Sequence, residues 1–488
     1  MNREKITKKE NKDREIGRRM AGRIYEGKRV LIVGMGKSGA AAMKAFASAG
    51  AEIAVFDSKD MEWNDRELFE RVGEIGAVPY FNGKVPPHEG WDYIVKSPGV
   101  PPTLPFIAAA VECGAVLMGD LDPAYQFAPE GAVFIAITGT NGKTTTTTLV
   151  GEIYKNAGAV SVVTGNIGTP VIESAVKAAY GTIFVTEVSS FQLEDSREFS
   201  PKVAALLNLT PDHLDRHGTM ESYGAAKARV FAAQGAGDYI VYNADDELVC
   251  GLVKSAPSKA FPFSRTKELE TGAFVKDGMI VLADSEAVVK KYKGVGSCET
   301  TALAAVGELR IPGAHNVENA LAAAAIAYCG GISPKVIAST LKCFKGVEHR
   351  MEHVATIDGV RFVNDSKGTN PDASTKAIEA SDAGILLIAG GYDKQSDFRP
   401  FVRGFGGKVK HLLLMGATAE RFKSEAEQEG FTDVTLCEDM GACVRLGFEL
   451  AERGDTVLLS PASASWDMYS CFEERGEHFK EIVEGLRR

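Results

Sequence analysis

The sequence lacks several features that would place it in particular classes of protein. Its eight cysteines are scattered, without a Cys-x-x-Cys pair, which argues against a zinc site or a disulfide framework and favours free thiols in a reducing compartment. The most apolar helix-like run, at 320–328, is too short to cross a bilayer, so we expect no membrane insertion. The charged residues 1–29 are not followed by the apolar stretch of a signal peptide. These absences predict a cytoplasmic protein.

Positive charge is also scarce. The 55 Lys and Arg residues are outnumbered by 65 Asp and Glu residues, giving a net charge of −10. This balance argues against nucleic acid as a partner, so a small anionic ligand would need a local basic pocket. With 488 residues, 45% of them hydrophobic, the chain is long enough for about three globular domains. The sequence contains no sustained short repeat, which excludes a solenoid.

The strongest motif that is present follows a short apolar strand at 132–138. It reads Gly139-Thr140-Asn141-Gly142-Lys143-Thr144-Thr145, a glycine-rich bend that leads into a helix. Backbone N–H groups and the helix dipole favour anions there, Lys143 suits the β- and γ-phosphates, and the Thr144 hydroxyl suits Mg²⁺. Ile137 replaces the first glycine of the longer Walker pattern, so an ordinary turn is the alternative. The order of strand, glycines, lysine and threonine favours an ATP-binding loop.

An earlier glycine motif, Gly34-x-Gly36-x-x-Gly39, follows a strand at 29–33. After a helix and a second strand comes Asp57, in the position that holds a ribose hydroxyl in dinucleotide-binding folds. NAD and a UDP-sugar both remain possible ligands. A later strand at 91–96 ends in Ser97-Pro-Gly, which is either a structural turn or part of the same site.

Beyond residue 128 apolar strands and helices alternate, which predicts a mostly parallel sheet with ligands at the carboxyl ends of its strands. Asn166, Glu187 and the pair Asp212–His213 fall at such ends. This oxygen-rich set suits Mg²⁺, although a lone histidine is more often structural. Asn316 and Asn319 share one face of a later alanine-rich helix, where they could cap and pack or hold an adenine edge.

The same alternation of strands and helices returns after residue 347. Polar groups again follow the strands, in Asp365-Ser-Lys367-Gly-Thr369, Gly390-Gly-Tyr-Asp-Lys394 and Ser460–Ser465, although solvated loop ends would look similar. The stretch 255–300 reads as a surface β-ribbon without chemistry. The predicted organisation is therefore a charged extension at 1–27 and three domains at 28–127, 128–347 and 348–488.

Seven motifs in this order together resemble the Mur ligase family. They are Gly-Thr-Asn-Gly-Lys-Thr, Gly-Asn-Ile-Gly, Glu-Val-Ser-Ser-Phe-Gln-Leu-Glu, Asp-His-Leu-Asp-Arg-His, Gly-Ala-His-Asn-x-x-Asn, Glu-His-Arg and Asn-Asp-Ser-Lys-Gly-Thr-Asn. The segments 187–194 and 459–467 resemble the branch of that family that adds D-glutamate. The resemblance runs from about residue 28 to 485. It implies an α/β fold of three domains, namely a Rossmann-like UDP-binding domain, a central P-loop ATPase and a Rossmann-like C-terminal domain.

The resemblance further implies an ATP-dependent ligase that joins D-glutamate to UDP-N-acetylmuramoyl-L-alanine through an acyl phosphate, in peptidoglycan precursor synthesis. It implies ATP and two Mg²⁺ ions as cofactors, with Lys227 carbamylated by CO₂, and we expect a monomer. The implied catalytic residues are Lys143, His213 and Lys227, and the implied metal ligands are Thr144, Glu187, His213 and the Lys227 carbamate. The implied ATP site comprises Gly139, Thr140, Asn141, Gly142, Lys143, Thr144, Thr145, Asn316, Asn319, Arg350 and Asp365. The implied UDP-substrate contacts are Ser38, Asp57, Ser97 and Asn166, and the D-glutamate contacts are Lys367, Thr369, Lys394, Ser465 and Phe472.

Other functions remain as alternatives. A sister ligase would add a different amino acid, whereas a folylpolyglutamate synthetase would lack the first domain. A regulator could bind nucleotide without turnover, although the intact Lys143, Glu187, His213 and Lys227 argue against it. An NAD oxidoreductase would leave the phosphate loop unexplained. At the UDP site, Lys37 and Ser58-Lys59 depart from the residues familiar in the family.

Overall fold

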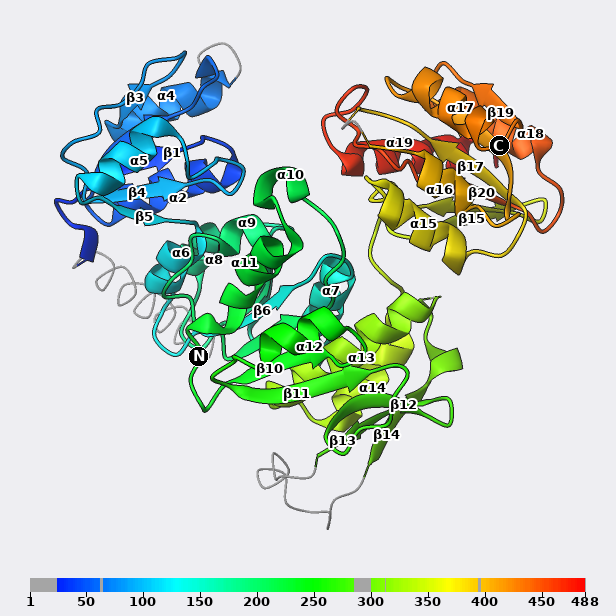
Figure 1. Ribbon diagram of the computed structural model, residues 1–488, viewed down its shortest axis with the longest axis horizontal. Coiled ribbons are helices and arrows are strands. Elements are labelled where there is room, and N and C mark those ends of the chain that lie inside the picture. Colours follow the sequence, from blue (N-terminus) through cyan, green and yellow to red (C-terminus); the bar gives the residue numbers. More distant parts are fainter. Residues whose placement is uncertain (1–23, 62–64, 285–299, 312, 394–395, 488) are drawn as a thin grey trace, which may run out of the picture. The chain divides into compact units, whose positions relative to one another are not determined.

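The computed structural model describes residues 24–61, 65–284, 300–311, 313–393 and 396–487 (Figure 1). Most of the predicted N-terminal extension, and Lys394 among the predicted site residues, lie outside this part of the chain. The chain divides into two compact units. The first unit is Met1–Glu308 with Glu318–Cys343, and the second is Leu309–Val317 with Phe344–Arg488.

The first unit begins with a five-stranded parallel sheet of order β3-β2-β1-β4-β5. Strand β1 is almost continuously apolar and its last four residues are buried, as expected for a central parallel strand. The strand order reverses between β1 and β4, so the crevice for a ligand lies at their carboxyl ends. The elements are β1 (Arg29–Val33), α2 (Lys37–Ser48), β2 (Glu52–Phe56), α4 (Arg66–Ile75), β3 (Val78–Tyr80), β4 (Tyr93–Lys96), α5 (Pro105–Glu112) and β5 (Val116–Met118).

The same unit contains a nine-stranded sheet of order β14-β13-β12-β11-β10-β9-β6-β8-β7. Its strands are parallel from β7 to β12, while β13 pairs antiparallel with both β12 and β14. The strands are β6 (Val133–Thr138), β7 (Ser161–Gly165), β8 (Ile183–Glu187), β9 (Val203–Leu206), β10 (Tyr239–Asn243), β11 (Lys259–Ser264), β12 (Gly272–Lys276), β13 (Met279–Ala283) and β14 (Thr301–Ala305). The helices are α6 (Leu121–Phe127), α7 (Lys143–Asn156), α8 (Val171–Lys177), α9 (Ser190–Leu193), α10 (Leu214–His217), α11 (Met220–Ala232), α12 (Glu247–Val253), the 3₁₀ turn η2 (Val306–Glu308), α13 (Ala314–Cys329) and α14 (Pro334–Cys343).

The second unit is built on a six-stranded sheet of order β15-β16-β20-β17-β18-β19, in which only the edge strand β15 is antiparallel. Alternate residues of β17 point to opposite faces: Leu387 packs with α15, α16 and α17, and Leu386 with α18 and α19. Both faces are therefore covered by helices. The elements are β15 (Glu352–Ile357), β16 (Val360–Asn364), α15 (Pro371–Ala380), β17 (Ile385–Ala389), α16 (Arg399–Arg403), β18 (Val409–Leu414), α17 (Ala419–Gln428), β19 (Val434–Leu436), α18 (Met440–Leu450), β20 (Thr456–Leu459) and α19 (Phe472–Gly485).

The predicted α/β class and the strands on which it was based are confirmed. The prediction of a surface ribbon at 255–300 is wrong for its described part. There β11–β14 extend the central sheet, and β13 has a buried core that includes Ile280 and Leu282. Within the described residues, no helix combines the length and the hydrophobicity needed to cross a bilayer.

Candidate active site

The predicted phosphate loop joins the carboxyl end of β6 to the first turn of α7. Gly142 precedes the helix in the left-handed conformation, at φ 80°, and Lys143 is the first residue of α7. A Cβ atom on Gly142 would lie 2.2 Å from Asn319 Oδ1, so the side chain of Asn319 on α13 rests directly on the loop. Both the backbone angle and this close approach require glycine.

The loop is fixed by a residue that the sequence analysis did not single out. Asn208, just after β9, accepts a hydrogen bond from Asn141 N (2.8 Å) and donates one to Asn141 O (3.1 Å). Its own carbonyl accepts from Thr140 N at 3.1 Å. These bonds hold the loop in one conformation. The available signal was the position of Asn208 at a strand exit, beside β6.

Two lysines converge on one carbonyl of this loop. Lys143 Nζ donates to Gly139 O (2.9 Å) and Thr140 O (2.8 Å), and Lys227 Nζ, from α11, donates to Gly139 O at 2.8 Å. Burial, followed by the nearby charge of Lys143, holds the pKa of Lys227 well below its usual value, although Asp212 and Glu187 oppose this shift. Burial therefore makes the amine of Lys227 easier to deprotonate than that of an ordinary surface lysine.

The carboxylate of Glu187 lies at the carboxyl end of β8. Its Oε1 accepts from Asn166 Nδ2 at 3.0 Å, so the structure brings together two of the predicted site residues. Its Oε2 is buried and has no hydrogen-bond partner among the described residues. An orphaned buried carboxylate oxygen is costly unless a cation or donor joins it. Together with the hydroxyl of Thr144, in the first turn of α7, this donor set fits Mg²⁺.

His213 is less enclosed than these groups. It has φ 52°, and its side chain is 48% exposed, with Nε2 3.4 Å from Asp212 Oδ2 and its ring 4.9 Å from that of Phe191. Asp212 in turn acts on Lys227, which places the 212–213 turn on the same side of the site as the buried lysine.

Three of the predicted UDP contacts, Ser38, Asp57 and Ser97, lie beyond the carboxyl ends of β1, β2 and β4, whereas Asn166 lies beside Glu187 in the other sheet. Asp57 accepts from Met35 N (2.8 Å) and Lys59 N (3.0 Å), so it also braces the glycine loop. Ser97 Oγ donates to Gly34 O at 2.7 Å. Ser38, in the first turn of α2, donates its hydroxyl hydrogen to Asp120. These contacts form a preorganised polar crevice.

In the second unit, Asp365 is fully buried beside Arg350. Its carboxylate accepts from Met351 N (3.2 Å) and Ser460 Oγ (2.7 Å). Burial raises the pKa of Asp365 to about 6, although the charge of Arg350 acts in the opposite direction. Burial, with Arg350 and Lys376, lowers the pKa of His315 to about 4. The start of α13, which carries Asn316, therefore belongs to this polar group.

The predicted D-glutamate contacts also meet at strand exits. Lys367 Nζ lies 5.0 Å over the ring of Phe472, and Thr369 N donates to Lys367 O at 2.9 Å. Ser465 is buried, and its carbonyl accepts from Met468 N and Tyr469 N. Lys394 is outside the described residues.

Arg475 bonds to both of the segments that carry Lys367 and Ser465. Its buried guanidinium donates to Ser366 O (2.8 Å) and Ala464 O (3.2 Å), the neighbours of Lys367 and Ser465. The sequence analysis missed this residue, because an arginine in a charged helix carries no signal of burial.

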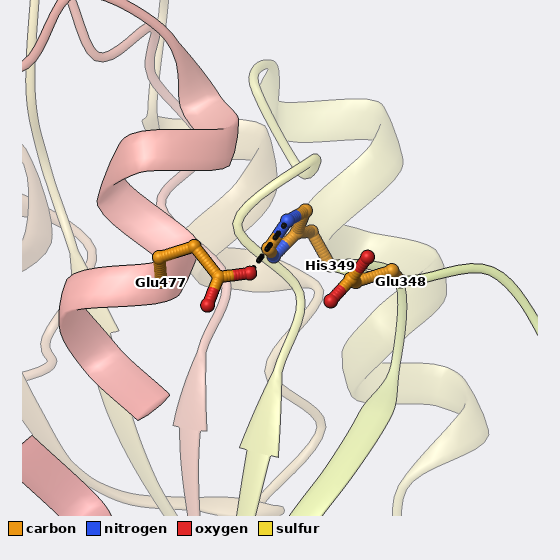
Figure 2. A group of neighbouring side chains, drawn as sticks. All are labelled: Glu348, His349 and Glu477. Atoms are coloured by element: carbon orange, nitrogen blue, oxygen red, sulfur yellow. Dashed lines mark ion pairs between the residues drawn. The ribbon is translucent and has the colours of Figure 1, made fainter. Parts of the chain in front are cut away.

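A histidine with two acidic neighbours forms another group in the second unit (Figure 2). Ligand atoms of Glu348, His349 and Glu477 all lie within 4.8 Å of one another. However, Lys480 Nζ lies 2.6 Å from Glu348 Oε1 and 2.8 Å from Glu477 Oε1, and His349 Nδ1 is 3.0 Å from Asn364 Nδ2. The ammonium of Lys480 already pairs with both carboxylates, so the group fastens the Glu-His-Arg segment to α19.

Sequence profiles of three domains match successive parts of the chain. They are the Mur ligase MurD-like N-terminal domain at residues 28–119, the Mur ligase middle domain at 137–327 and the Mur ligase glutamate ligase domain at 349–463. The chain belongs to the Mur ligase family. All three matched regions contain strand exits at which the predicted site residues lie.

Several relatives of the family are similar over their whole length. A UDP-N-acetylmuramoylalanine–D-glutamate ligase of Thermoanaerobacter pseudethanolicus is 46% identical over 469 residues, which cover 95% of this chain and 99% of the relative. The enzymes of the same name from Alkaliphilus oremlandii and Clostridioides difficile are 47% and 43% identical. They cover 94% and 95% of this chain, and 99% of each relative.

Solved structures of more distant Mur ligases share the fold. UDP-N-acetylmuramate-alanine ligase MurC from Thermotoga maritima superposes with a TM-score of 0.57 at 18% identity, covering 94% of this chain and 99% of the other. A pseudomurein peptide ligase type C from Methanothermus fervidus gives 0.55 at 17% identity, covering 94% and 100%.

Proposed function

We propose that this Mur ligase joins D-glutamate to UDP-N-acetylmuramoyl-L-alanine with cleavage of ATP to ADP and phosphate, in peptidoglycan precursor synthesis. The observation that carries this proposal is the similarity, over almost the whole chain, to ligases named for that reaction. The grouping of Lys367, Ser465 and Phe472 in the second unit supports the choice of a glutamate acceptor. We place the reaction in the cytoplasm and expect a monomer.

The chemistry has two steps. The terminal carboxylate of the UDP-linked substrate attacks the γ-phosphorus of ATP, and an acyl phosphate and ADP form. The neutral amine of D-glutamate then attacks the acyl carbon, and phosphate leaves as the amide bond forms. A carboxylate is a poor electrophile, so phosphorylation supplies the leaving group that the amine can displace.

Residues of the first unit act on the phosphates. The ammonium of Lys143 and the N–H groups at the start of α7 neutralise charge on the transferred phosphoryl group. Thr144 and Glu187 would hold Mg²⁺, and His213 would join a second ion; the bound metal would offset phosphate charge. Asn319 and Thr145 border the loop, while Asn316, Arg350 and Asp365 of the second unit are proposed nucleotide contacts.

The buried amine of Lys227, whose pKa is lowered by burial, is suited to react with CO₂ in its deprotonated form. Its nitrogen lone pair would attack the carbon of CO₂, forming a carbamate and releasing one proton. This converts a potential cation into an anion, which fits a site that must hold divalent metal.

For the amino acid, we propose that Lys367, Thr369 and Lys394 donate to the two carboxylates of D-glutamate. Ser465 would add a hydroxyl donor, and Phe472 would form the apolar wall. For the other substrate, Ser38, Asp57, Ser97 and Asn166 are the proposed contacts.

The test is a coupled assay of ADP release with UDP-N-acetylmuramoyl-L-alanine and a panel of amino acids. We expect turnover with D-glutamate and little with L-glutamate, because inverting the α-carbon cannot keep both carboxylates on their donors and aim the amine. Preference for alanine or a diamino acid would assign the chain to a sister activity, and ADP release without amide formation would contradict a ligase.

A further inference from the structure

A buried lysine at the end of β4 has no role in the site described above. The side chain of Lys96 is 0% exposed, and its Nζ lies 3.2 Å from Glu194 Oε1 and 2.7 Å from Asp195 Oδ2. A buried ammonium is strongly unfavourable unless carboxylates pair with it. The two carboxylates therefore hold the end of β4 in one place relative to the end of α9.

The two ends that Lys96 joins both carry predicted substrate groups. On one side the chain continues directly from Lys96 into Ser97, whose hydroxyl donates to Gly34 O in the glycine loop. On the other side, Glu194 follows α9, which begins three residues after Glu187. The ion pair thus links the UDP crevice of the first sheet to the metal-binding end of the central sheet.

A second cation, Arg216, holds the far end of the turn 97–100 that follows Lys96. Arg216, on α10, bonds through Nη2 to Glu194 Oε1 and donates to Val100 O at 3.1 Å. The turn 97–100 is therefore held before its first residue by Lys96 and at its last residue by Arg216. Glu194 and Asp195 supply the carboxylates that pair with these two cations.

The segment that connects the two sheets, which includes α6, makes further contacts with the turn after α9. Asp120, just before α6, accepts from Gln192 Nε2 at 3.1 Å. Asp122 accepts four hydrogen bonds from the turn 196–199, at 2.8–3.1 Å. The charge of Lys96 also acts on the buried Asp120. The four bonds of Asp122 do not involve Lys96, so removing that charge should loosen the 97–100 turn without detaching α6.

We propose that Lys96 is a positioning residue for the UDP-linked substrate, because it fixes the turn 97–100 against the segment that follows Glu187. This inference rests on the proposed function. It predicts a selective effect on one of the three substrates, since neither the phosphate loop nor the second unit is bonded to Lys96 in the described contacts.

The decisive variant is Lys96→Met, which keeps the length of the side chain and removes the charge. Losing a charge-assisted bond should raise the KM for UDP-N-acetylmuramoyl-L-alanine about ten- to a hundredfold, while the KM values for ATP and D-glutamate stay within about twofold. Lys96→Arg should recover most of the lost affinity. The matched control is Lys28→Met, at the other end of the first sheet, where the lysine pairs with Asp92 at 3.0 Å and is 45% exposed.

An unchanged KM for the UDP-linked substrate, or three KM values raised alike, would overturn the proposal. If Lys96→Met does not fold, Asp195→Asn is the variant that tests the proposal. It weakens the contact between Lys96 and Asp195 and should also raise the KM for the UDP-linked substrate. If the wild-type protein releases no ADP with D-glutamate, the proposed function fails. Calorimetric binding of the UDP-linked substrate to wild type and Lys96→Met then still tests the inference.

Discussion

Two lysines that share one acceptor differ in burial. Both Lys143 and Lys227 donate to Gly139 O, and only Lys227 is almost fully buried. Placing two ammonium groups on one carbonyl is unfavourable, and burial together with the charge of Lys143 lowers the pKa of Lys227. The less buried Lys143 is therefore the better cation for phosphate chemistry, and Lys227 is the lysine that more readily gives a free amine.

Lys143→Ala should reduce kcat for ligation by roughly 100- to 1,000-fold, because charge on the transferred phosphoryl group is no longer neutralised. The UDP-linked substrate should still bind, which calorimetry can measure. Lys155→Ala is the control, since Lys155 lies on the same helix with a side chain that is 72% exposed. A Lys143→Ala enzyme that keeps a tenth of wild-type activity or more would contradict this role.

Lys227→Arg should be inactive although it preserves the parent charge, because a guanidinium cannot form the carbamate. In the wild-type protein, ¹³C NMR after addition of labelled bicarbonate should show one carbamate signal that is missing from Lys227→Arg. Arg229, on the same helix, provides the control Arg229→Lys, which should retain both activity and signal. Normal turnover by Lys227→Arg would rule out the carbamate.

Asp365 should make the second unit less stable as pH rises. Its folded-state pKa, about 6, lies above the ordinary 3.8, so its contribution to stability is complete below pH 3.8 and is lost through pH 6. Between pH 4 and 7, the unfolding free energy of wild type should fall relative to Asp365→Asn by up to roughly 3 kcal/mol. Denaturant unfolding at several pH values measures this difference. Asp382→Asn, at a side chain that is 78% exposed, is the control, and parallel curves for Asp365→Asn would refute the prediction.

At the scale of elements, α7 is bounded by two glycines with similar backbone angles and different surroundings. Gly142 has φ 80° and Gly158 has φ 75°. A Cβ atom at Gly142 would meet Asn319 Oδ1, whereas one at Gly158 would meet nothing within 4 Å. Comparing substitutions at the two glycines therefore distinguishes the effect of the left-handed backbone from the effect of the contact between α13 and the phosphate loop.

Gly142→Ala should abolish measurable ATP binding, because Asn319 must move and the loop with it. Gly158→Ala should lower stability by only about 1 kcal/mol, the cost of the left-handed conformation, and leave ATP affinity unchanged. Fluorescent-nucleotide titration and thermal unfolding of the two variants give both quantities. Equal loss of ATP affinity in both would show that backbone strain alone is responsible.

The elements themselves were largely predictable from the sequence, because the signals for them are local. Continuous apolar runs predicted β6, β17 and the other central strands. Strands such as β19, with three residues, are too short to carry such a pattern. Strand order was not predictable, since it depends on contacts between distant segments.

In the candidate site, too, residues with a local sequence signal could be predicted, and residues that act through distant segments could not. Lys143 and Glu187 were found because they follow buried strands in recognisable order. Asn208 and Arg475 were missed because they act through backbone atoms of segments that lie far away in the sequence. Their role could be recognised only once the fold had brought those segments together.

At the scale of the whole molecule, the second unit contains its own core. Its two large clusters, around Leu387 and around Leu386, consist of residues of that unit alone. The first unit has a separate cluster that includes residues of both its sheets, such as Val30 of β1 and Phe134 of β6. Each unit therefore has the apolar burial needed for a cooperative transition of its own.

Calorimetry of the full chain should accordingly show at least two unfolding transitions. Leu387→Ala should lower the unfolding free energy of the second unit alone, by about 2–5 kcal/mol. Ile135→Ala should lower that of the first unit alone by a similar amount. Both side chains are fully buried, so the two substitutions are matched. A single transition that both variants shift equally would contradict independent cores.

The carboxylates that flank the start of α6 have a consequence for exchanging parts between related enzymes. A chimaera joined at residue 119 keeps Asp122 with the turn 196–199 and Asp120 with Gln192. A junction at residue 127 brings in foreign residues at both positions and leaves the N–H donors of the turn 196–199 without acceptors. The compatible crossover point therefore lies before α6, and the seven residues of this helix are inherited with the ATP-binding half of the protein.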